Sequence, residues 1–225
     1  MAIQLLLRAL VPLKPPTEAK ARLSDLLSPE ERAQLARVTF RTVVDALFGA
    51  GVPCAVLTPN AAVATDLAAG RGVVIKERPG IRGLSAQLEA ALDSAAFADG
   101  GTVLILHADL PLATPGAVRL LAAAAGEHAA GVTMVESADG GTNAMILPLP
   151  RPFALHYGSQ SFALHSEAVR AAGLTVVSYP SAELALDLDT PADIRALLAS
   201  PAGRKSPAGQ LLLGMGVESR LTGTA

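Results

Sequence analysis

The segment TVLILHADLP, residues 102–111, combines a continuous apolar run with a carboxylate placed directly after it. An uninterrupted run of this length is typical of a strand buried on both faces of a parallel sheet. Similar runs lie upstream, at residues 3–13 and 53–58, and downstream, at residues 131–136. Asp109 follows the quoted run where the carboxyl end of a strand meets the edge of the sheet, which is where α/β proteins bind their ligands.

Helical segments with recognisable start signals separate these runs. Ser28-Pro29-Glu30-Glu31 predicts an N-cap serine, a proline at the first helical position and a capping box, with the helix ending at about Gly49 or Gly51. Further helices are expected at 60–69, 84–97, from Thr114, from Ser161 and from Thr190, and short strands at 72–76, 143–147 and 174–179. This alternation predicts an α/β fold, Rossmann-like, with a mostly parallel sheet flanked by helices. A turn at 138–141 joins two neighbouring strands, so the later half departs from strict alternation.

The length of 225 residues is that of one domain, which we place at residues 1–200. Residues 201–225 are rich in Gly, Pro, Ser and basic side chains, and predict a C-terminal tail that is either mobile or an interface arm. The apolar patch Leu211-Leu212-Leu213 within it could dock on a partner subunit, as in a homodimer, or on its own domain.

Composition and charge exclude several classes of protein. The 18 basic and 20 acidic residues give a net charge of -2, which argues against sequence-independent nucleic-acid binding. The single cysteine, Cys54, can form no internal disulfide, and the four histidines lack the spacing of a zinc motif. The first apolar run is interrupted by Arg8 and falls short of the roughly 20 residues that span a bilayer. We expect a cytoplasmic protein with neither nucleic acid nor membrane as partner.

Charged side chains follow the ends of several expected strands. Lysine and arginine complement phosphate charge, and carboxylates hold Mg²⁺ that bridges phosphate oxygens. The cations are Lys14, Lys20 and Arg22, and the carboxylates are Asp109, Asp187 and Asp189.

A second group offers hydrogen-bond donors to an anion. A helix beginning at Ser161, after Gly158, presents free backbone N–H groups. Thr142 and Asn143 follow two glycines and can add hydroxyl and amide donors. Together with the charged group, this predicts a site for two phosphorylated partners, one of them bound to magnesium.

Structural roles compete with these functional ones. Asp193 has the position of a capping residue, and Asp189 could belong to the turn before Thr190. The three loop cations could be solvated charges, and Gly140-Gly141 could form only a hairpin turn. Tyr157 suits packing and His107 a strand end beside Asp109, whereas His165 could face the site from its helix.

Five blocks of sequence, in order along residues 3–199, carry a resemblance to a known family. They are VPLKPPTEAKARLS, HADLPLATP, DGGTNAMILP, YGSQSFALHSEA and LALDLDTPADI. The chain resembles the 2-phospho-L-lactate or phosphoenolpyruvate guanylyltransferases of coenzyme F-420 biosynthesis. The resemblance implies a single-domain nucleotide-diphospho-sugar transferase fold. It also implies that GMP passes from GTP to a small phospho-carboxylate, with release of pyrophosphate and with Mg²⁺ as cofactor.

The resemblance also implies residue roles. Asp109, Asp187 and Asp189 match the metal-holding pattern, and Thr142, Gly158 and Ser161, with Asn143 beside them, match the acceptor site. Lys14, Lys20 and Arg22 match the loop that faces the triphosphate, and Lys20, Arg22 and Asp109 are the expected catalytic residues. Gly83 and Ser85 match nucleotide-binding positions, although family members usually carry asparagine where this chain has Ser85.

Two other functions remain open on the sequence. One is a related nucleotidyltransferase with another acceptor, such as a molybdopterin, a sugar phosphate or 3-phosphoglycerate; the absence of a GGxGxRxG loop argues against the sugar enzymes. The other is a catalytically silent GTP-binding regulator. Among acceptors, phosphoenolpyruvate is our first choice. It differs from 2-phospho-L-lactate and 3-phosphoglycerate only by groups worth about 1–3 kcal/mol in a pocket, so one or two side chains could set the preference.

Overall fold

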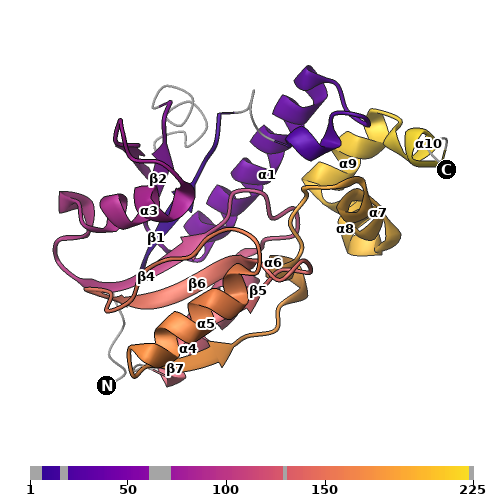
Figure 1. Ribbon diagram of the computed structural model, residues 1–225. Coiled ribbons are helices and arrows are strands. Elements are labelled where there is room, and N and C mark those ends of the chain that lie inside the picture. Colours follow the sequence, from indigo (N-terminus) through magenta and orange to yellow (C-terminus); the bar gives the residue numbers. More distant parts are fainter. Residues whose placement is uncertain (1–6, 16–19, 61–71, 129–130, 223–225) are drawn as a thin grey trace.

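Seven strands form one sheet within the described residues, 7–15, 20–60, 72–128 and 131–222, of this computed structural model (Figure 1). In sheet order they are β3 (Gly72–Lys76), β2 (Cys54–Thr58), β1 (Leu7–Pro12), β4 (Gly101–Leu106), β6 (Thr142–Leu149), β5 (Gly131–Glu136) and β7 (Thr175–Ser178). The α/β class and the mostly parallel sheet predicted from the sequence are confirmed. The helix expected at 60–69 lies, apart from residue 60, outside the described residues, as do residues 3–6 of the first apolar run.

One strand runs antiparallel to its neighbours, and its direction decides which of its residues lie at the carboxyl edge of the sheet. β6 pairs antiparallel with both β4 and β5, while the remaining pairs are parallel. The predicted turn lies between β5 and β6, where Gly140 adopts φ 83°, a conformation that favours glycine. Because β6 is reversed, its amino end, with Thr142 and Asn143, lies at the carboxyl edge of β4 and β5.

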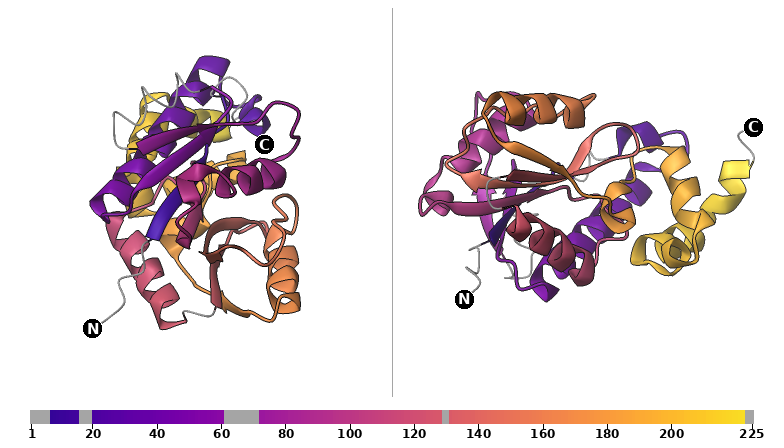
Figure 2. Two further views of the ribbon diagram at one scale, coloured as in Figure 1. Left: turned by 90° about the vertical axis from the view of Figure 1, so that its left-hand side faces the viewer. Right: turned by 90° about the horizontal axis from the view of Figure 1, so that it is seen from below.

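Helices cover both faces of the sheet (Figure 2). On one face α1 (Pro29–Gly49) and α4 (Pro115–Glu127) bury a cluster around Phe40 and Val118. On the other face α3 (Leu84–Leu92) and α5 (Ser161–Ala171) bury a second cluster around Leu88. These two layers hold the strands rigidly, which fixes the positions of the side chains at the strand ends.

Side-chain caps are present at three of the predicted helix starts, Ser28, Thr114 and Thr190, whereas α3 and α5 begin without one. Ser28 forms the predicted capping box with Glu31, and Thr114 caps α4 by accepting a hydrogen bond from Ala117 N. α3 is shorter than the predicted 84–97: it ends at Leu92 and is followed by a 3-10 turn, η2 (Ala95–Phe97). The Ser94 hydroxyl donates to Ala91 O at 2.6 Å, taking a carbonyl that a continued helix would use.

The C-terminal segment, expected to be either a mobile terminus or an interface arm, is helical in its described part, up to residue 222. It comprises α8 (Pro201–Lys205), α9 (Pro207–Gly214) and α10 (Val217–Thr222), after α6 (Ala182–Ala185) and α7 (Pro191–Ala199). Ser200 and Ser206 each cap a helix that begins with proline. This serine–proline pair is a helix start signal that the prediction from the tail's composition did not use.

The tail docks on its own domain. Leu212 and Val217 are fully buried in a third apolar cluster with Leu23, Leu27 and Leu35, beside α1 and the 3-10 turn η1 (Ala21–Leu23). In the part of the chain that the structure describes, no helix has the length and apolar character needed to cross a membrane.

Candidate functional site

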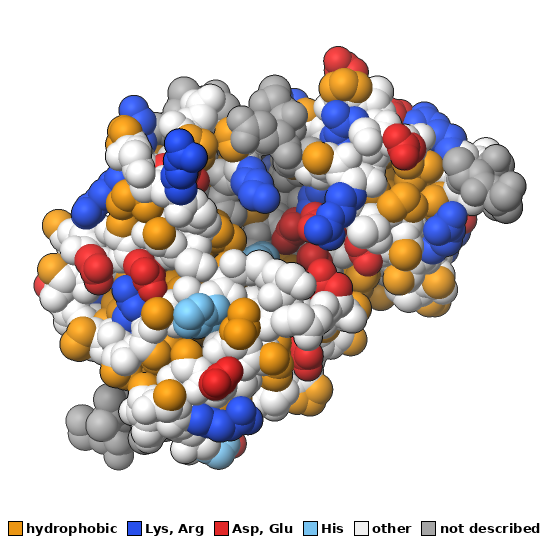
Figure 3. Space-filling model, viewed as in Figure 1, with side chains coloured by type: hydrophobic (Ala, Val, Ile, Leu, Met, Phe, Trp, Pro, Cys, Tyr) orange, Lys and Arg blue, Asp and Glu red, His pale blue; other side chains and the backbone are white. Residues whose placement is uncertain are grey.

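A cavity of about 390 Å³ opens at the carboxyl edge of the sheet. Its walls come from the ends of β1, β4 and β5, the start of β6, the segment 157–161 and the segment before α7. In Figure 3 acidic and basic side chains gather around a hollow in the middle of the face shown. Chain segments far apart in the sequence therefore contribute charges to one concave site.

Three carboxylates form one wall of the cavity. Asp109, Asp187 and Asp189 each place an oxygen within 4.8 Å of the oxygens of the other two. Asp109 Oδ1 is buried and has no hydrogen-bond partner among the described residues. Burial, and then the neighbouring charge of Asp109, raises the pKa of Asp187 to about 6. Like charges this close need a cation, and carboxylate oxygens are the ligands that Mg²⁺ and Mn²⁺ prefer, so this cluster fits a divalent metal.

Lys20 is the cation that contacts this cluster. Its Nζ lies 2.8 Å from Asp109 Oδ2 and 3.1 Å from Asp189 Oδ1, and its side chain is only 4% exposed. Burial by itself lowers the pKa of Lys20, but the two carboxylates outweigh burial and raise it. Likewise burial alone raises the pKa of Asp109, and the Lys20 ammonium outweighs it and lowers that pKa. Both groups are therefore charged near neutral pH.

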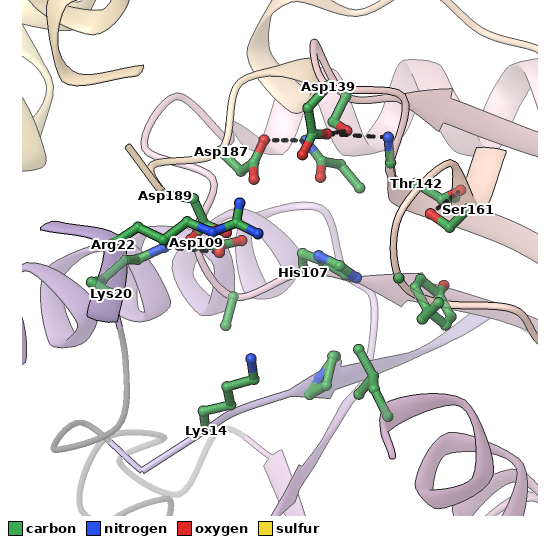
Figure 4. Close-up of a pocket in the computed structure, with 18 of the residues that line it drawn as sticks. Lys14, Lys20, Arg22, His107, Asp109, Asp139, Thr142, Ser161, Asp187 and Asp189 are labelled. Carbon is green, nitrogen blue, oxygen red and sulfur yellow. Dashed lines mark hydrogen bonds and ion pairs between the residues drawn. The ribbon is translucent and has the colours of Figure 1, made fainter. Parts of the chain in front are cut away.

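The opposite wall is built from hydroxyl groups. Thr142 begins β6 and Ser161 begins α5, and Ser161 Oγ donates to Thr142 Oγ1 at 3.2 Å. Gly158 and Ser159 line the cavity beside them. Figure 4 shows the three aspartates near Lys20 and Arg22 on one side and Thr142 with Ser161 on the other. A molecule lying between the two walls would touch charges at one end and donors at the other.

Ten of the predicted site residues line this cavity: Lys14, Lys20, Arg22, Asp109, Thr142, Asn143, Gly158, Ser161, Asp187 and Asp189. Lys14 and Arg22 are exposed at its rim. Asn143 Nδ2 donates to Asp187 Oδ1 at 3.3 Å and to Ala185 O at 3.0 Å, so it also holds the carboxylate segment in place.

Gly83 and Ser85 are not among the residues that line the cavity; Leu84 between them is. Gly83 precedes α3 with φ 87°, and Ser85 Oγ accepts a hydrogen bond from Tyr157 N at 2.7 Å. This serine thus holds the segment that carries Gly158. Asp193 has the structural role of a helix cap that was weighed against a functional role, since its carboxylate accepts a hydrogen bond from Thr190 N at 2.6 Å.

Several lining residues were not among the predicted site residues. Ser137, Asp139 and Gln160 line the cavity, and so do His107 and Tyr157, which the sequence left as a strand end and as packing. The Ser137 hydroxyl, and to a smaller extent the Gly141 amide and the charge of Arg22, lower the pKa of Asp139. The signal was available for Asp139, because it follows the carboxyl end of a strand just as Asp109 does.

Comparisons with known proteins agree with this geometry. The family model described as "Guanylyl transferase CofC like" matches residues 7–223. A phosphoenolpyruvate guanylyltransferase of Rubrobacter xylanophilus is 37% identical over 193 residues, 85% of this chain and 93% of that protein. A 2-phospho-L-lactate guanylyltransferase of Halomicrobium mukohataei is 37% identical over 212 residues, 94% of each chain. A 3-phospho-D-glycerate guanylyltransferase of Phenylobacterium zucineum is 34% identical, covering 84% of this chain and 88% of its own.

Solved structures share the fold at low sequence identity. A Desulfovibrio desulfuricans G20 protein classed among the nucleotide-diphospho-sugar transferases superposes with a TM-score of 0.77 at 18% identity, covering 97% of this chain and 99% of that one. Rv0371c of Mycobacterium tuberculosis H37Rv, solved in complex with manganese, gives a TM-score of 0.53 at 18% identity, covering 86% of this chain and 98% of its own. The expected single-domain nucleotide-diphospho-sugar transferase fold is confirmed, and the chain is a nucleotidyltransferase that belongs to the CofC-like guanylyl transferase family.

Proposed function

We propose that this enzyme transfers GMP from GTP to a small phospho-carboxylate, phosphoenolpyruvate or 2-phospho-L-lactate, and releases pyrophosphate, as a step of coenzyme F-420 biosynthesis. One observation carries this: a carboxylate–lysine wall and a hydroxyl wall face each other across one cavity of about 390 Å³. The first wall suits a metal-bound triphosphate, and the second suits a small anion.

The reaction needs positioning and charge neutralisation more than proton transfer. A phosphate oxygen of the acceptor forms a bond to the α-phosphorus of GTP, and the bond from that phosphorus to the α–β bridging oxygen of GTP breaks, so that this oxygen leaves with pyrophosphate. Phosphate monoesters are largely ionised near neutral pH, so this attack requires no general base. The protein has to hold the two phosphates in line and stabilise the charge that develops on the leaving group.

A divalent cation is part of this proposal. Asp109, Asp187 and Asp189 would hold it, and we propose Mg²⁺, the usual partner of nucleoside triphosphates. When bound, the ion neutralises phosphate charge as a Lewis acid. The unpartnered Asp109 Oδ1 supports a metal at this cluster, and Rv0371c, which shares the fold, was solved in complex with manganese.

The remaining roles follow from position. Lys14 and Arg22 at the rim would stabilise charge on the pyrophosphate, whereas Lys20 would act through its bonds to Asp109 and Asp189. We propose that Thr142, Asn143, Gly158 and Ser161 hold the acceptor, and that Gly83 and Ser85 shape the nucleotide side through Leu84 and the Tyr157 segment. GTP and phosphorylated three-carbon acids are cytoplasmic metabolites, so we place the enzyme in the cytoplasm.

The test is an assay of pyrophosphate release with GTP and each of three acids, phosphoenolpyruvate, 2-phospho-L-lactate and 3-phosphoglycerate, combined with a measurement of the mass of the product. ATP and CTP in parallel test the preference for guanine. Asp109→Asn should lower turnover roughly 100-fold or more, the scale of losing one preorganised charge-stabilising group. Asp99→Asn is the matched control, because Asp99 is exposed and is not among the residues that line the cavity. Near-normal turnover in a folded Asp109→Asn protein would refute the metal assignment.

The two other functions predict different results in the same assay. A silent regulator would bind GTP and release no pyrophosphate with any acid. An enzyme for a molybdopterin or sugar-phosphate acceptor would be inactive with the three-carbon acids and active with its own substrate. The relatives' names give small phospho-carboxylates as substrates, which favours neither a silent regulator nor a molybdopterin or sugar-phosphate acceptor. One of the names gives 3-phospho-D-glycerate, the other acceptor of the first alternative, and the assay includes that acid.

A further inference from the structure

We propose that His165 is a positioning residue for the acceptor subsite: its ring donates to Thr142 and thereby leaves one hydroxyl hydrogen of the Thr142–Ser161 pair to point at the ligand. His165 does not line the cavity and is fully buried behind it, within α5. That the ligand is the phospho-carboxylate rests on the proposed function. The hydrogen-bond arrangement itself does not.

A backbone amide selects the protonation state of the ring. His156 N lies 2.8 Å from His165 Nε2, and an amide N–H can only donate, so Nε2 must accept. The neutral ring then carries its hydrogen on Nδ1, which lies 3.0 Å from Thr142 Oγ1. An imidazolium would have donors on both nitrogens and would break the bond to His156.

The surroundings of the ring keep it neutral. Burial, followed by the charges of His156 and His107, lowers the pKa of His165 to about 4. Tyr157 packs edge-on against the ring at 4.8 Å between centroids, and His156 lies at 6.3 Å. Among the described residues, His107, His156 and Tyr157 are thus the titratable groups that the structure shows acting on or packing against the ring. The donor on Nδ1 is therefore present throughout the neutral range.

With the His165 donor in place, one hydroxyl hydrogen of the Thr142–Ser161 pair is left unused. The three groups hold three hydrogens: one on His165 Nδ1, one on the Ser161 hydroxyl and one on the Thr142 hydroxyl. In the described part of the chain, their mutual bonds are the histidine–threonine bond and the serine–threonine bond, which use two. One O–H remains without an acceptor, and both hydroxyls belong to cavity-lining residues that are at most 2% exposed.

The consequence is a subsite that presents a donor to its ligand. If position 165 accepted a hydrogen bond instead, the threonine hydrogen could turn toward it and leave oxygen lone pairs facing the cavity. Lone pairs repel a carboxylate or phosphate, whereas an O–H group in a buried site stabilises it. His165 thus sets the polarity of the subsite without touching the ligand.

Substitution by asparagine or glutamine distinguishes the roles of the two ring nitrogens, because each amide replaces only one of them. The amide of asparagine reaches about as far as Nδ1 and can donate to Thr142, so His165→Asn should rescue function. The amide of glutamine reaches as far as Nε2 and meets the His156 amide, leaving Thr142 without its donor. His165→Phe keeps the ring and removes both bonds. His128→Asn is the matched control, because His128 ends α4 and is not among the cavity residues.

The first measurement is equilibrium binding of phosphoenolpyruvate and of 2-phospho-L-lactate without GTP, by calorimetry. We expect a dissociation constant about 10-fold higher for His165→Phe and His165→Gln, the scale of one hydrogen bond to an anion. For His165→Asn we expect less than about 3-fold by the same reasoning. Steady-state kinetics should show the same rise in KM for the acid and an unchanged KM for GTP.

The outcomes are distinguishable. If the wild-type protein binds neither acid, the proposed acceptor is wrong. Nitrogen-correlated NMR of the His165 ring then still tests the arrangement: a hydrogen on Nε2 overturns it and one on Nδ1 supports it. If the wild type binds and His165→Gln binds equally well, the proposal is refuted. Equal rises in KM for GTP and the acid, together with a lower Tm, would show a merely structural role and refute it as well.

Discussion

Replacing Lys20 with methionine should destabilise the protein without metal and make it more responsive to metal. Methionine keeps most of the apolar stem and removes the charge that lies 2.8 Å from Asp109 and 3.1 Å from Asp189. The change leaves three neighbouring carboxylates, within 4.8 Å of one another, without their internal cation.

The magnitude follows from burial. Removing one partner of a buried ion pair costs about 3–5 kcal/mol, and since the Asp109 side chain is 25% exposed we take the lower value, about 3 kcal/mol. The Asp189 side chain is 43% exposed, so its pair adds little. At roughly 2–4 °C per kcal/mol for a chain of this size, Tm in EDTA should fall by about 6–12 °C.

Divalent metal should reverse much of this loss. A site with one positive charge fewer binds a cation more tightly, and an ion at 100 times its Kd contributes about 2.7 kcal/mol of stability. Mn²⁺ or Mg²⁺ should therefore raise the Tm of Lys20→Met by more than it raises that of the wild type.

The assay is thermal unfolding by circular dichroism, with EDTA and then with a titration of each metal. Lys14→Met is the matched control: it removes the same charge from an exposed residue of the same cavity. A Tm for Lys20→Met within 2 °C of that control, or equal metal shifts in both variants, would refute the reasoning.

Three further predictions use unfolding measurements. Asp187 has a pKa raised from 3.8 to about 6, so its ionisation opposes folding, fully above pH 6 and not at all below 3.8; in EDTA at pH 8, Asp187→Asn should be more stable than wild type by about 1–2 kcal/mol, discounted for partial exposure, with the gap narrowing as pH falls through 6 and closing only near pH 3.8. His165 has a pKa lowered from 6.5 to about 4, so the stability that the neutral ring contributes is present above pH 6.5 and is lost as pH falls through 4. In urea titrations across that range, the free energy of unfolding of His165→Asn should therefore fall less at acid pH than that of the wild type, by up to about 3 kcal/mol. Leu212→Ala should lose about 2–4 kcal/mol, and Leu213→Ala, at a partly exposed position, clearly less; equal and negligible losses would mean that the tail does not pack in solution.

Local signals in the sequence account for most of the elements. Ser28 and Thr114 are caps that work within one helical turn, and the apolar run that ends before His107 needs only its own length to be recognised as a buried strand. The tail was harder, because its composition resembles a linker and helices this short need docking, here in the cluster with Leu27 and Leu35, in addition to their serine caps.

The candidate site, too, was partly predictable from the sequence and partly dependent on the tertiary structure. The rule that ligands meet the carboxyl ends of strands was enough to select Asp109, and the family resemblance supplied Thr142 and Ser161 as acceptor residues. The expected turn at 138–141 implied that the strand carrying Thr142 reverses against the strand before it, but not that it also pairs antiparallel with β4, because that pairing depends on residues elsewhere in the sheet. Only that reversal places Thr142 at the cavity.

The sequence by itself determined the fold class, the family and ten residues of the cavity, because strand periodicity, helix caps and ordered motifs are written in neighbouring residues. The tertiary structure decided how those residues pair. Lys20 meets Asp109 across 89 positions and Asp189 across 169, and His165 reaches Thr142 across 23. Contacts of that kind depend on how the layers pack, and they set which groups are charged, which hydrogen is free and which side chain holds another in place.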